Sequence, residues 1–222
     1  PGTLINVTAA VKIVKLARFV GRGGDKLLAA IRHMDFNVKG KVCADVGAST
    51  GGFTDCLLQH GAVRVYAIDV GKGLLHWRLR KDPRVIVMEK TNARYVEGLP
   101  EAVSLVTIDA SFISLEKLLP VVSSWLVPET GCIVALIKPQ FEAGRELVGK
   151  GGVVRDPAVH RDVLTRVVEF AIKEELRPLK IIPSPLRGPA GNVEFFLLLC
   201  QSGDIPEIGE LTAVRYPSKW LP

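Results

Sequence analysis

A glycine-rich turn between an apolar run and a helical pattern constrains this chain more than any other stretch. The apolar run Lys41-Val-Cys-Ala-Asp-Val46 leads into the turn Asp45-Val-Gly-Ala-Ser-Thr-Gly-Gly-Phe-Thr-Asp55. Its glycines permit positive φ and let a ligand approach the backbone, and the amides that open the next helix point outward as donors. The pattern therefore predicts a strand, a tight turn and a helix start that hold a nucleotide-like ligand.

The order of the glycines distinguishes between kinds of nucleotide site. The turn lacks the Gly-Lys-Ser/Thr ending of a nucleoside triphosphate loop, and its glycines do not follow the G-x-G-x-x-G order of dinucleotide sites. An acidic residue at the strand end, followed by Gly-x-Ser-Thr-Gly-Gly, is typical of S-adenosylmethionine (AdoMet) sites. A glycine turn that joins a strand to a helix without any ligand is the alternative.

Strand-like and helical patterns alternate from residue 41 onward, and this alternation indicates the fold class. We expect strands at 41–46, 63–69, 85–89, 103–109 and 132–138, with helices near 51–60, 73–81 and 114–126. Repeated strand-helix-strand units of this length form a right-handed, parallel, doubly wound sheet. Asp156-Pro157 then opens a helix to about residue 175, because Asp caps a helix and Pro is favoured at its first position.

The last two predicted strands lie too close together for a helix to connect them. A strand at 179–182 is followed by the Pro- and Gly-rich turn 183–191 and by a final strand at 193–200. Such a short connection makes the final strand antiparallel to its predecessor. We therefore expect an α/β, Rossmann-like fold of the AdoMet-dependent methyltransferase kind, with a seven-stranded, mostly parallel sheet whose last strand is antiparallel. The same features disfavour a nicotinamide-dependent enzyme.

The hydrophobic runs and the cysteines indicate the cellular compartment of the protein. Although 48% of the residues are hydrophobic, no apolar run approaches the roughly 20 residues of a membrane span, and no signal peptide opens the sequence. We expect a soluble, cytoplasmic protein. The four cysteines show no C-x-x-C pairing and are interpreted as free core residues in a reducing compartment. The four histidines are scattered without ligand spacing, so no metal is expected.

Positive charge is concentrated near the start of the chain. Residues 1–41 contain eight Lys and Arg residues against two acidic ones, which is a net charge of +6, and the rest of the chain is neutral. A basic lobe on a neutral body favours a polyanionic partner. A solvated basic surface without a partner would give the same pattern.

Polar groups follow the apolar runs at four predicted strand ends, at Asp45, Asp69, Asp109 and Lys138. In an open parallel sheet, ligands bind beyond the carboxyl ends of the strands, where the strand order reverses. Asp69 is suited to accept hydrogen bonds from ribose hydroxyls, and Asn92, after the third strand, is suited to read an adenine edge. The structural alternatives are a helix cap for Asp69 and a turn residue for Asn92.

Glu194 reaches the same sheet edge from the opposite direction. Because its strand is antiparallel, that strand begins where the parallel strands end, so Glu194 meets Asp109 and Lys138. Lys26 arrives from the first turn of a helix that starts after Gly21-Arg-Gly-Gly24. Two lysines and two carboxylates balance each other's charge and form a candidate reactive site. A structural cluster of salt bridges would produce the same pattern.

Eight ordered motifs resemble those of the TlyA-type ribosomal RNA 2′-O-methyltransferases. These enzymes are relatives of the FtsJ heat-shock methyltransferases and are sometimes labelled hemolysins. The resemblance covers about residues 20–200, and the chain departs from the family pattern at Gly21 and Leu74, where serine and glutamine are usual. The motifs are Arg22–Leu27, Asp45–Asp55, Asp69–Gly71 with His76-Trp77, Glu89–Arg94, Asp109–Leu115, Leu136–Glu142, Gly149–Asp156 and Gly191–Glu194.

The resemblance implies AdoMet as methyl donor and ribosomal RNA as partner, with transfer to a ribose 2′-hydroxyl of a cytidine. It implies a catalytic Lys-Asp-Lys-Glu tetrad, which falls on Lys26, Asp109, Lys138 and Glu194, and our hypothesis makes Lys138 the general base. The expected cofactor contacts are Asp45, Gly47, Ser49, Thr50, Gly51, Gly52, Phe53, Asp69, Val70, Asn92 and Asp109. The expected RNA contacts are Arg22, Arg145, Lys150 and Arg155, the last three in a glycine-bearing loop that would otherwise be a mobile surface loop.

Members of this family also carry a small N-terminal RNA-binding domain. We therefore expect residues 1–20 to be the remnant or linker of such a domain, 21–200 the methyltransferase domain and 201–222 a C-terminal tail. Two other functions stay open from the sequence. One is a membrane-active hemolysin, and the other is an AdoMet-binding RNA module without turnover.

Overall fold

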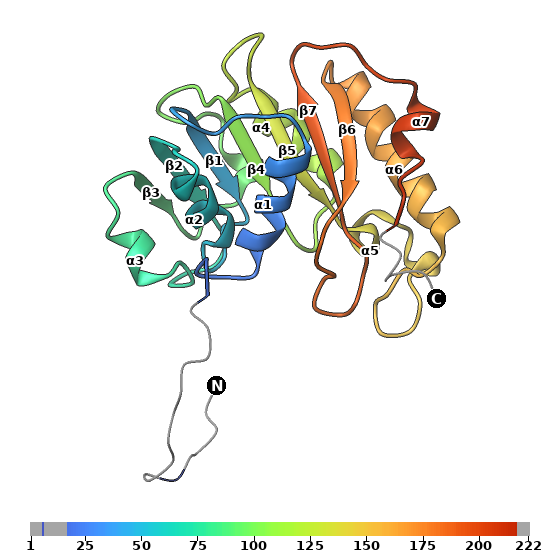
Figure 1. Ribbon diagram of the computed structural model, residues 1–222, viewed down its shortest axis with the longest axis horizontal. Coiled ribbons are helices and arrows are strands. Elements are labelled where there is room, and N and C mark those ends of the chain that lie inside the picture. The colour runs from blue at the N-terminus through green and yellow to red at the C-terminus, as the bar shows by residue number, and fades with distance from the viewer. Residues whose placement is uncertain (1–5, 7–16, 217–222) are drawn as a thin grey trace.

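One seven-stranded sheet runs through the protein and carries helices on both faces (Figure 1). The computed structural model describes residue 6 and residues 17–216, so most of the predicted N-terminal segment and the end of the predicted tail lie outside the described residues. The strand order is β3-β2-β1-β4-β5-β7-β6. The strands are β1 (Val42–Val46), β2 (Arg64–Ile68), β3 (Val85–Met88), β4 (Leu105–Ile108), β5 (Cys132–Ile137), β6 (Arg177–Pro183) and β7 (Phe195–Cys200).

The strand directions confirm the predicted fold class. β1 pairs in parallel with β2 on one side and with β4 on the other, and β3 and β5 extend the parallel sheet outward. β7 is antiparallel to both of its neighbours, β5 and β6. Because the strand order reverses between β1 and β4, the ligand-binding edge of such a sheet lies beyond the carboxyl ends of these two strands.

The register of β7 brings two distant parts of the chain together at that edge. Ile137, the last residue of β5, pairs with Phe195, the first residue of β7. The residues just beyond this pair are Lys138 and Glu194, and they therefore face the same end of the sheet as the carboxyl ends of β1 and β4.

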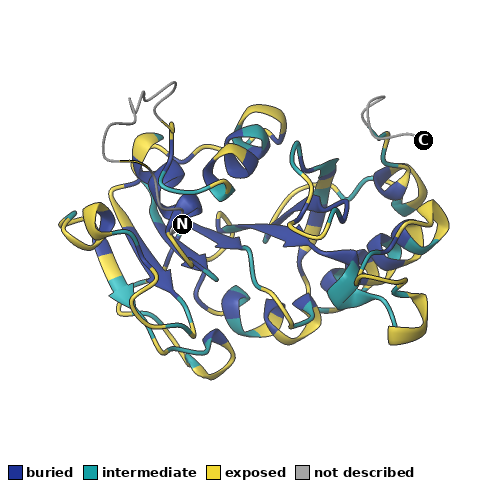
Figure 2. Ribbon diagram, turned by 90° about the horizontal axis from the view of Figure 1, so that it is seen from below, coloured by how far each residue is buried: buried dark blue, intermediate teal, exposed yellow. Residues whose placement is uncertain are grey.

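Helices cover the sheet in two layers, and the buried strands lie between them (Figure 2). One core cluster packs α1 and α2 on the side chains of one sheet face, and the other packs α4, α6 and α7 on the opposite face. Alternate strand residues enter the two clusters, as the pleat of a strand requires. The helices are α1 (Gly23–His33), α2 (Gly52–Gln59), α3 (Trp77–Arg80), α4 (Leu119–Ser123), α5 (Pro139–Glu142), α6 (Pro157–Lys173) and α7 (Ile208–Thr212), with 3₁₀ turns η1 (Ala93–Tyr95), η2 (Leu115–Lys117) and η3 (Arg145–Leu147).

Several predicted helix bounds are wrong. α1 begins at Gly23, because Gly24 lets the helix lie against Phe19; a Cβ on Gly24 would be 2.2 Å from the Phe19 ring. The helix expected at 114–126 is split into η2 and α4, with Pro120 near the start of α4, where a missing N–H does no harm. The start of α6 is confirmed, since the Asp156 side chain accepts a hydrogen bond from the Ala158 amide at 2.8 Å.

The prediction of four free cysteines is wrong for two of them. Cys132 and Cys200 form a disulfide, because the β5–β7 register places them opposite each other. The bond lies at the end of these strands remote from Lys138 and Glu194. Cys43 and Cys56 are free and buried, as expected. Within residues 17–216, no helix combines the length and apolar character that crossing a bilayer requires.

Candidate active site

Two ion pairs lie at the ligand-binding edge of the sheet, one of them buried and the other partly exposed at Asp109, whose side chain is 21% exposed. Lys26 Nζ donates to Glu194 Oε2 at 2.6 Å, and Lys138 Nζ lies 2.6 Å from Asp109 Oδ1. The Glu194 side chain is 1% exposed and both lysine side chains are 9% exposed. The structure thus brings together the four residues that the sequence places at this edge.

Close backbone packing places Lys26 at the sheet. A Cβ on Gly52 would lie 2.9 Å from the Gly24 amide nitrogen, so only glycine lets α1 and α2 approach this closely. Lys26 lies in the first turns of α1, buried, and reaches across to β7 from there. The glycine-rich turn therefore positions a charged side chain from another element of the chain.

The charges of the two pairs influence each other. Burial raises the pKa of the Glu194 carboxyl above its ordinary value, and the nearby Lys26 and Lys138 ammonium groups oppose that rise. Asp109 adds to the rise. The other three tetrad groups thus all act on Glu194, and removal of Lys26, its direct partner, would leave Glu194 disfavoured as a buried anion.

A cleft of about 900 Å³ opens at the ends of β1, β2 and β4, within the size range of small-molecule and cofactor sites. Six of the predicted cofactor contacts line it, whereas five others do not. Lining residues are Gly47, Ser49, Asp69, Val70, Asn92 and Asp109. The predicted residues outside the lining are Asp45, Thr50, Gly51, Gly52 and Phe53.

Asp69 and Asn92 both organise the loops of the cleft. The Asp69 carboxylate accepts hydrogen bonds from the Gly71 amide at 2.7 Å and from the Ser49 amide at 2.8 Å. Each carboxylate oxygen retains further acceptor capacity for a ligand. The Asn92 side-chain oxygen accepts from the Arg94 amide at 3.1 Å, so the predicted turn role of Asn92 is present.

The glycines of the turn contact the protein itself. Gly47 has φ +83°, and a Cβ there would lie 2.7 Å from the Asp109 carbonyl oxygen, so this glycine lets the turn after β1 approach the end of β4. Gly51 has φ +95° and lies against the Leu79 and Leu75 side chains. Close approach at these positions thus serves internal packing, and Gly47 alone among them also lines the cleft.

The other predicted contacts outside the cleft have structural partners. Asp45 is fully buried and accepts hydrogen bonds from Thr54 Oγ1 at 2.6 Å and Thr107 Oγ1 at 3.1 Å. Burial raises the pKa of the Asp45 carboxyl to about 7. Phe53 packs in the core with its ring centroid 6.1 Å from that of Phe196, and the Thr50 carbonyl accepts from the His76 amide at 3.1 Å.

Asp109 is the tetrad residue that lines the cleft, and residues outside the tetrad line it close to Asp109. Ser111 Oγ accepts from Lys138 Nζ at 3.0 Å. Phe112 is 89% exposed at φ +62°, and its ring centroid lies 4.9 Å from that of Phe141. Ser111 and Phe112 lie in the motif after β4, and Phe141 lies in the motif after β5. The sequence does not reveal that Phe112 is exposed or which side chains contact each other.

Glu142 ties the loop after β4 to α5. Its carboxylate accepts from the Ser114 hydroxyl at 2.7 Å and from the Leu115 amide at 2.9 Å. Burial raises the pKa of this carboxyl as well. The loop that carries Ser111 and Phe112 is therefore fixed next to the helix that follows Lys138.

The four predicted RNA contacts are exposed, one just before α1 and three in the segment between α5 and α6. Arg22 donates to the Arg187 carbonyl oxygen at 3.1 Å, and Arg145 lines the cleft. Lys150 and Arg155 lie on the loop between α5 and α6 (Figure 1).

Asn192 fixes the second end of that loop. The Asn192 side chain is buried; it accepts from the Val154 amide at 2.9 Å and donates to the Gly152 carbonyl at 2.8 Å. Two residues further along, Glu194 binds Lys26. The loop is therefore anchored to the segment that leads into Glu194.

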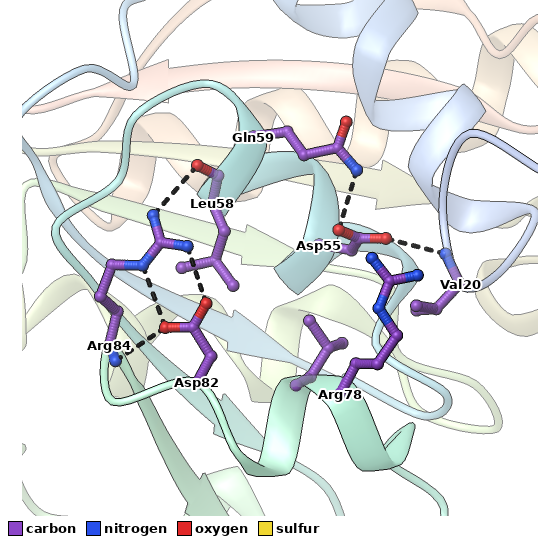
Figure 3. A pocket seen from close by; sticks show the side chains of 8 residues that line it. Val20, Asp55, Leu58, Gln59, Arg78, Asp82 and Arg84 are labelled. Carbon is purple, nitrogen blue, oxygen red and sulfur yellow. Dashed lines mark hydrogen bonds and ion pairs between the residues drawn. The ribbon is translucent and has the colours of Figure 1, made fainter.

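A second cavity, of about 300 Å³, lies between α2 and α3 (Figure 3). Its polar groups are largely paired with each other. Arg84 binds the Asp82 carboxylate, and Asp55 accepts from the Val20 amide and from Gln59. None of the four tetrad residues lines it. Across the described residues, no group of three or more His, Cys, Asp or Glu side chains could hold a metal ion.

The chain has clear relatives. The model of the FtsJ-like methyltransferase family matches residues 19–201. YqxC of Bacillus subtilis, provisionally designated an rRNA methyltransferase, is 51% identical over 200 residues, which cover 87% of this chain and 70% of YqxC. The 16S/23S rRNA (cytidine-2′-O)-methyltransferase TlyA of Mycobacterium tuberculosis is 44% identical over 203 residues, covering 90% of this chain and 75% of TlyA. A solved Streptococcus thermophilus structure with a hemolysin designation has a TM-score of 0.83 and 43% identity, covering 90% of this chain and 75% of that one.

Proposed function

The chain belongs to the FtsJ-like methyltransferase family, and from this premise we propose that it methylates the 2′-hydroxyl of a cytidine ribose in ribosomal RNA, with AdoMet as donor. The observation that carries the proposal is the assembly of two lysine–carboxylate pairs at the sheet edge, where Asp109 of one pair lines a nucleotide-sized cleft. The proposed substrate follows the designation of TlyA, which is similar to this chain over most of its length.

The residues of the cleft fit AdoMet. Asp69, at the end of β2, offers carboxylate oxygens to ribose hydroxyls, and Val70 and Leu74 offer apolar surface to a purine ring. Gly47 exposes backbone next to Asp109 for the amino-acid end of the cofactor. When bound, AdoMet supplies a methyl group that is already activated by its sulfonium.

Lys138 is the proposed base. A ribose hydroxyl is a weak acid, so its oxygen becomes a better nucleophile if its proton passes to a nearby amine during attack. Lys138 accepts that proton after its ammonium has released one to solvent, and Asp109 at 2.6 Å compensates the ammonium charge that results. Ser111 and Asp109 together fix the direction of the amine.

Lys26 and Glu194 form the second pair, and they keep the net charge of the site close to zero while the proton moves. Because both side chains are buried, the pair holds α1 and β7 in fixed positions beside Lys138. Correct orientation of the hydroxyl toward the donor is expected to supply much of the rate enhancement.

The RNA would approach over the exposed side of the cleft. Phe112 presents an exposed ring on which a base that has left its stack can lie, and exposed aromatic rings are the usual platforms for single-stranded bases. Arg145 lines the cleft, Lys150 and Arg155 lie on the loop that Asn192 anchors, and Arg22 immediately precedes α1. All four are exposed and can bind phosphates. A ribosomal RNA substrate would place the protein in the cytoplasm.

Transfer of labelled methyl groups from AdoMet to purified ribosomal subunits tests this function. We expect a 2′-O-methylcytidine at a defined position, found by digestion and mass spectrometry of the RNA. A methyl group on a base would refute the proposed chemistry. Binding of AdoMet and RNA without any transfer would instead favour the module without turnover, and leakage of liposomes would favour a membrane-active role.

A further inference from the structure

The amide of Gln140 is a polar group of the cleft that the proposed chemistry leaves unused. Gln140 is the second residue of α5 and lines the cleft. Its Oε1 atom is buried, and no donor in the described part of the chain hydrogen-bonds to it. Buried polar atoms are almost always paired in folded proteins, and an exception calls for an explanation. An acceptor that waits for a donor from a ligand is such an explanation.

Gln140 lies toward the substrate side of the cleft. The residues suited to the cofactor follow β1 and β2, whereas α5 follows β5, which is separated from β1 by β4. The proposed base Lys138 lies two residues before Gln140, and Phe141, whose ring contacts Phe112, lies directly after it. The Lys138 ammonium lies 6.0 Å from the Phe141 ring centroid. A nucleotide whose ribose reaches Lys138 and whose base lies at these rings would pass Gln140.

We infer that the Gln140 amide binds the edge of the target base and makes Gln140 a specificity-determining residue, an inference that rests on the proposed function. Cytosine presents an exocyclic amine, which can donate to Oε1, beside a ring nitrogen, which can accept from Nε2. Uracil presents a carbonyl oxygen where cytosine has its amine, so Oε1 would face a second acceptor. Because Oε1 is buried in the free protein, this contact requires the amide to turn toward the base when the RNA binds.

The test compares subunits whose mapped target cytidine is unchanged with subunits in which it is replaced by uridine. For the wild-type protein we expect transfer to cytidine to be favoured by about 5–150-fold, the range for one good bidentate contact to a base. Gln140→Leu keeps the size of the side chain but removes both polar groups. We expect this variant to retain transfer to cytidine at a reduced rate and to lose most of the preference.

Two further measurements separate a base contact from other roles. Calorimetry should give the same AdoMet dissociation constant for Gln140→Leu as for the wild type, within about twofold; a tenfold weaker constant would assign the amide to the cofactor and overturn the inference. The melting temperature should stay the same or rise, because the substitution removes an unpaired buried atom. A marked fall in the melting temperature would show that the Gln140 amide has a structural partner, and this result would also overturn the inference.

Gln201→Leu is the matched control. Gln201 also has a buried Oε1 without a partner among the described residues, but it follows Cys200 at the other end of β7. We expect this variant to keep the wild-type base preference, and a changed preference would show that the Gln140 effect is not local. If the wild-type protein methylates no ribose, the proposed function fails; if it methylates cytidine with a preference that Gln140→Leu retains, only this inference fails.

Discussion

Lys26 Nζ and Glu194 Oε2 are 2.6 Å apart, although 168 residues separate them along the chain. Lys26 belongs to α1, the first helix, and Glu194 precedes β7, the last strand. One buried ion pair thus joins the beginning and the end of the described domain, beside the proposed base. A contact of this kind is expected to serve both stability and activity, and the two contributions can be separated.

Lys26→Met should lower the free energy of unfolding at neutral pH by about 3–5 kcal/mol, because it leaves the buried Glu194 carboxylate without its partner. Burial already raises the pKa of Glu194, so the loss should shrink as the pH falls and the carboxyl takes up a proton. The double variant Lys26→Met/Glu194→Gln should recover most of the stability but not the methyl transfer. Denaturant unfolding together with the labelled transfer assay measures both. A single variant as stable as the wild type would contradict this account of the pair.

Phe112→Gly should leave the free energy of unfolding within about 1 kcal/mol of the wild type, since Phe112 is 89% exposed and its φ of +62° suits glycine. Loss of a stacked base should instead raise the KM for RNA by roughly 5–150-fold, the equivalent of about 1–3 kcal/mol. Phe112→Leu, which keeps an apolar side chain without a ring, should show a similar rise. Steady-state kinetics with limiting subunits decides, and an unchanged KM in both variants would remove Phe112 from the RNA site.

Asp45 should make stability depend on pH. Burial raises the pKa of its carboxyl from 3.8 to about 7, so between about pH 4 and 7 the folded protein holds a proton that the unfolded chain has lost. The protonated Asp45 carboxyl therefore contributes fully to stability below its pKa in the unfolded chain, 3.8. The contribution is lost as the pH rises through its pKa in the folded protein, about 7. Its slope is at most about 1.4 kcal/mol per pH unit.

The measurement is denaturant unfolding of the wild type and Asp45→Asn at a series of pH values. The asparagine does not titrate, so the stability of the wild type relative to the variant should fall as the pH rises from about 4 to 7 and then level off. Parallel curves for the two proteins would show that Asp45 is ionised throughout this range.

Much of the fold could be predicted from the sequence, since it follows from local patterns. Alternating strands and helices define the parallel sheet, and the short connection before residue 193 makes β7 antiparallel. That one reversal places Glu194 at the same edge as Lys138, which is why the sequence predicts the convergence of the tetrad. In the sequence, Asp45 and Asp69 both end an apolar run, so the pattern does not distinguish a buried carboxylate from one that faces a ligand.

The features that the sequence did not predict depend on side-chain packing and on strand register, which local sequence patterns do not encode. Asp45 is enclosed by Thr54 and Thr107, whereas Asp69 faces the cleft. The exposure of Phe112 and the pairing of Cys132 with Cys200 likewise depend on how elements distant in the sequence align. A prediction from spacing alone could not reach them.

The Cys132–Cys200 bond should stabilise the fold without affecting catalysis. It closes a loop across a sequence separation of 68, for which removal of a disulfide typically costs about 2–4 kcal/mol. The double variant Cys132→Ser/Cys200→Ser should lose stability of this order but keep its AdoMet affinity and its rate at 25 °C, since the bond lies at the far end of β5 and β7 from the tetrad. Unfolding with and without a reductant gives the comparison, and an unchanged midpoint would argue against the bond.

Lys138→Met tests the central claim most directly, with methyl transfer and AdoMet binding measured on the same preparation. Methionine keeps the buried stem of the side chain and removes the amine that accepts the proton. We expect transfer to fall by at least about 100-fold, within the range for loss of a general base, while the AdoMet dissociation constant from calorimetry changes by less than about threefold. Transfer close to the wild-type rate would contradict the assignment of Lys138 as the base.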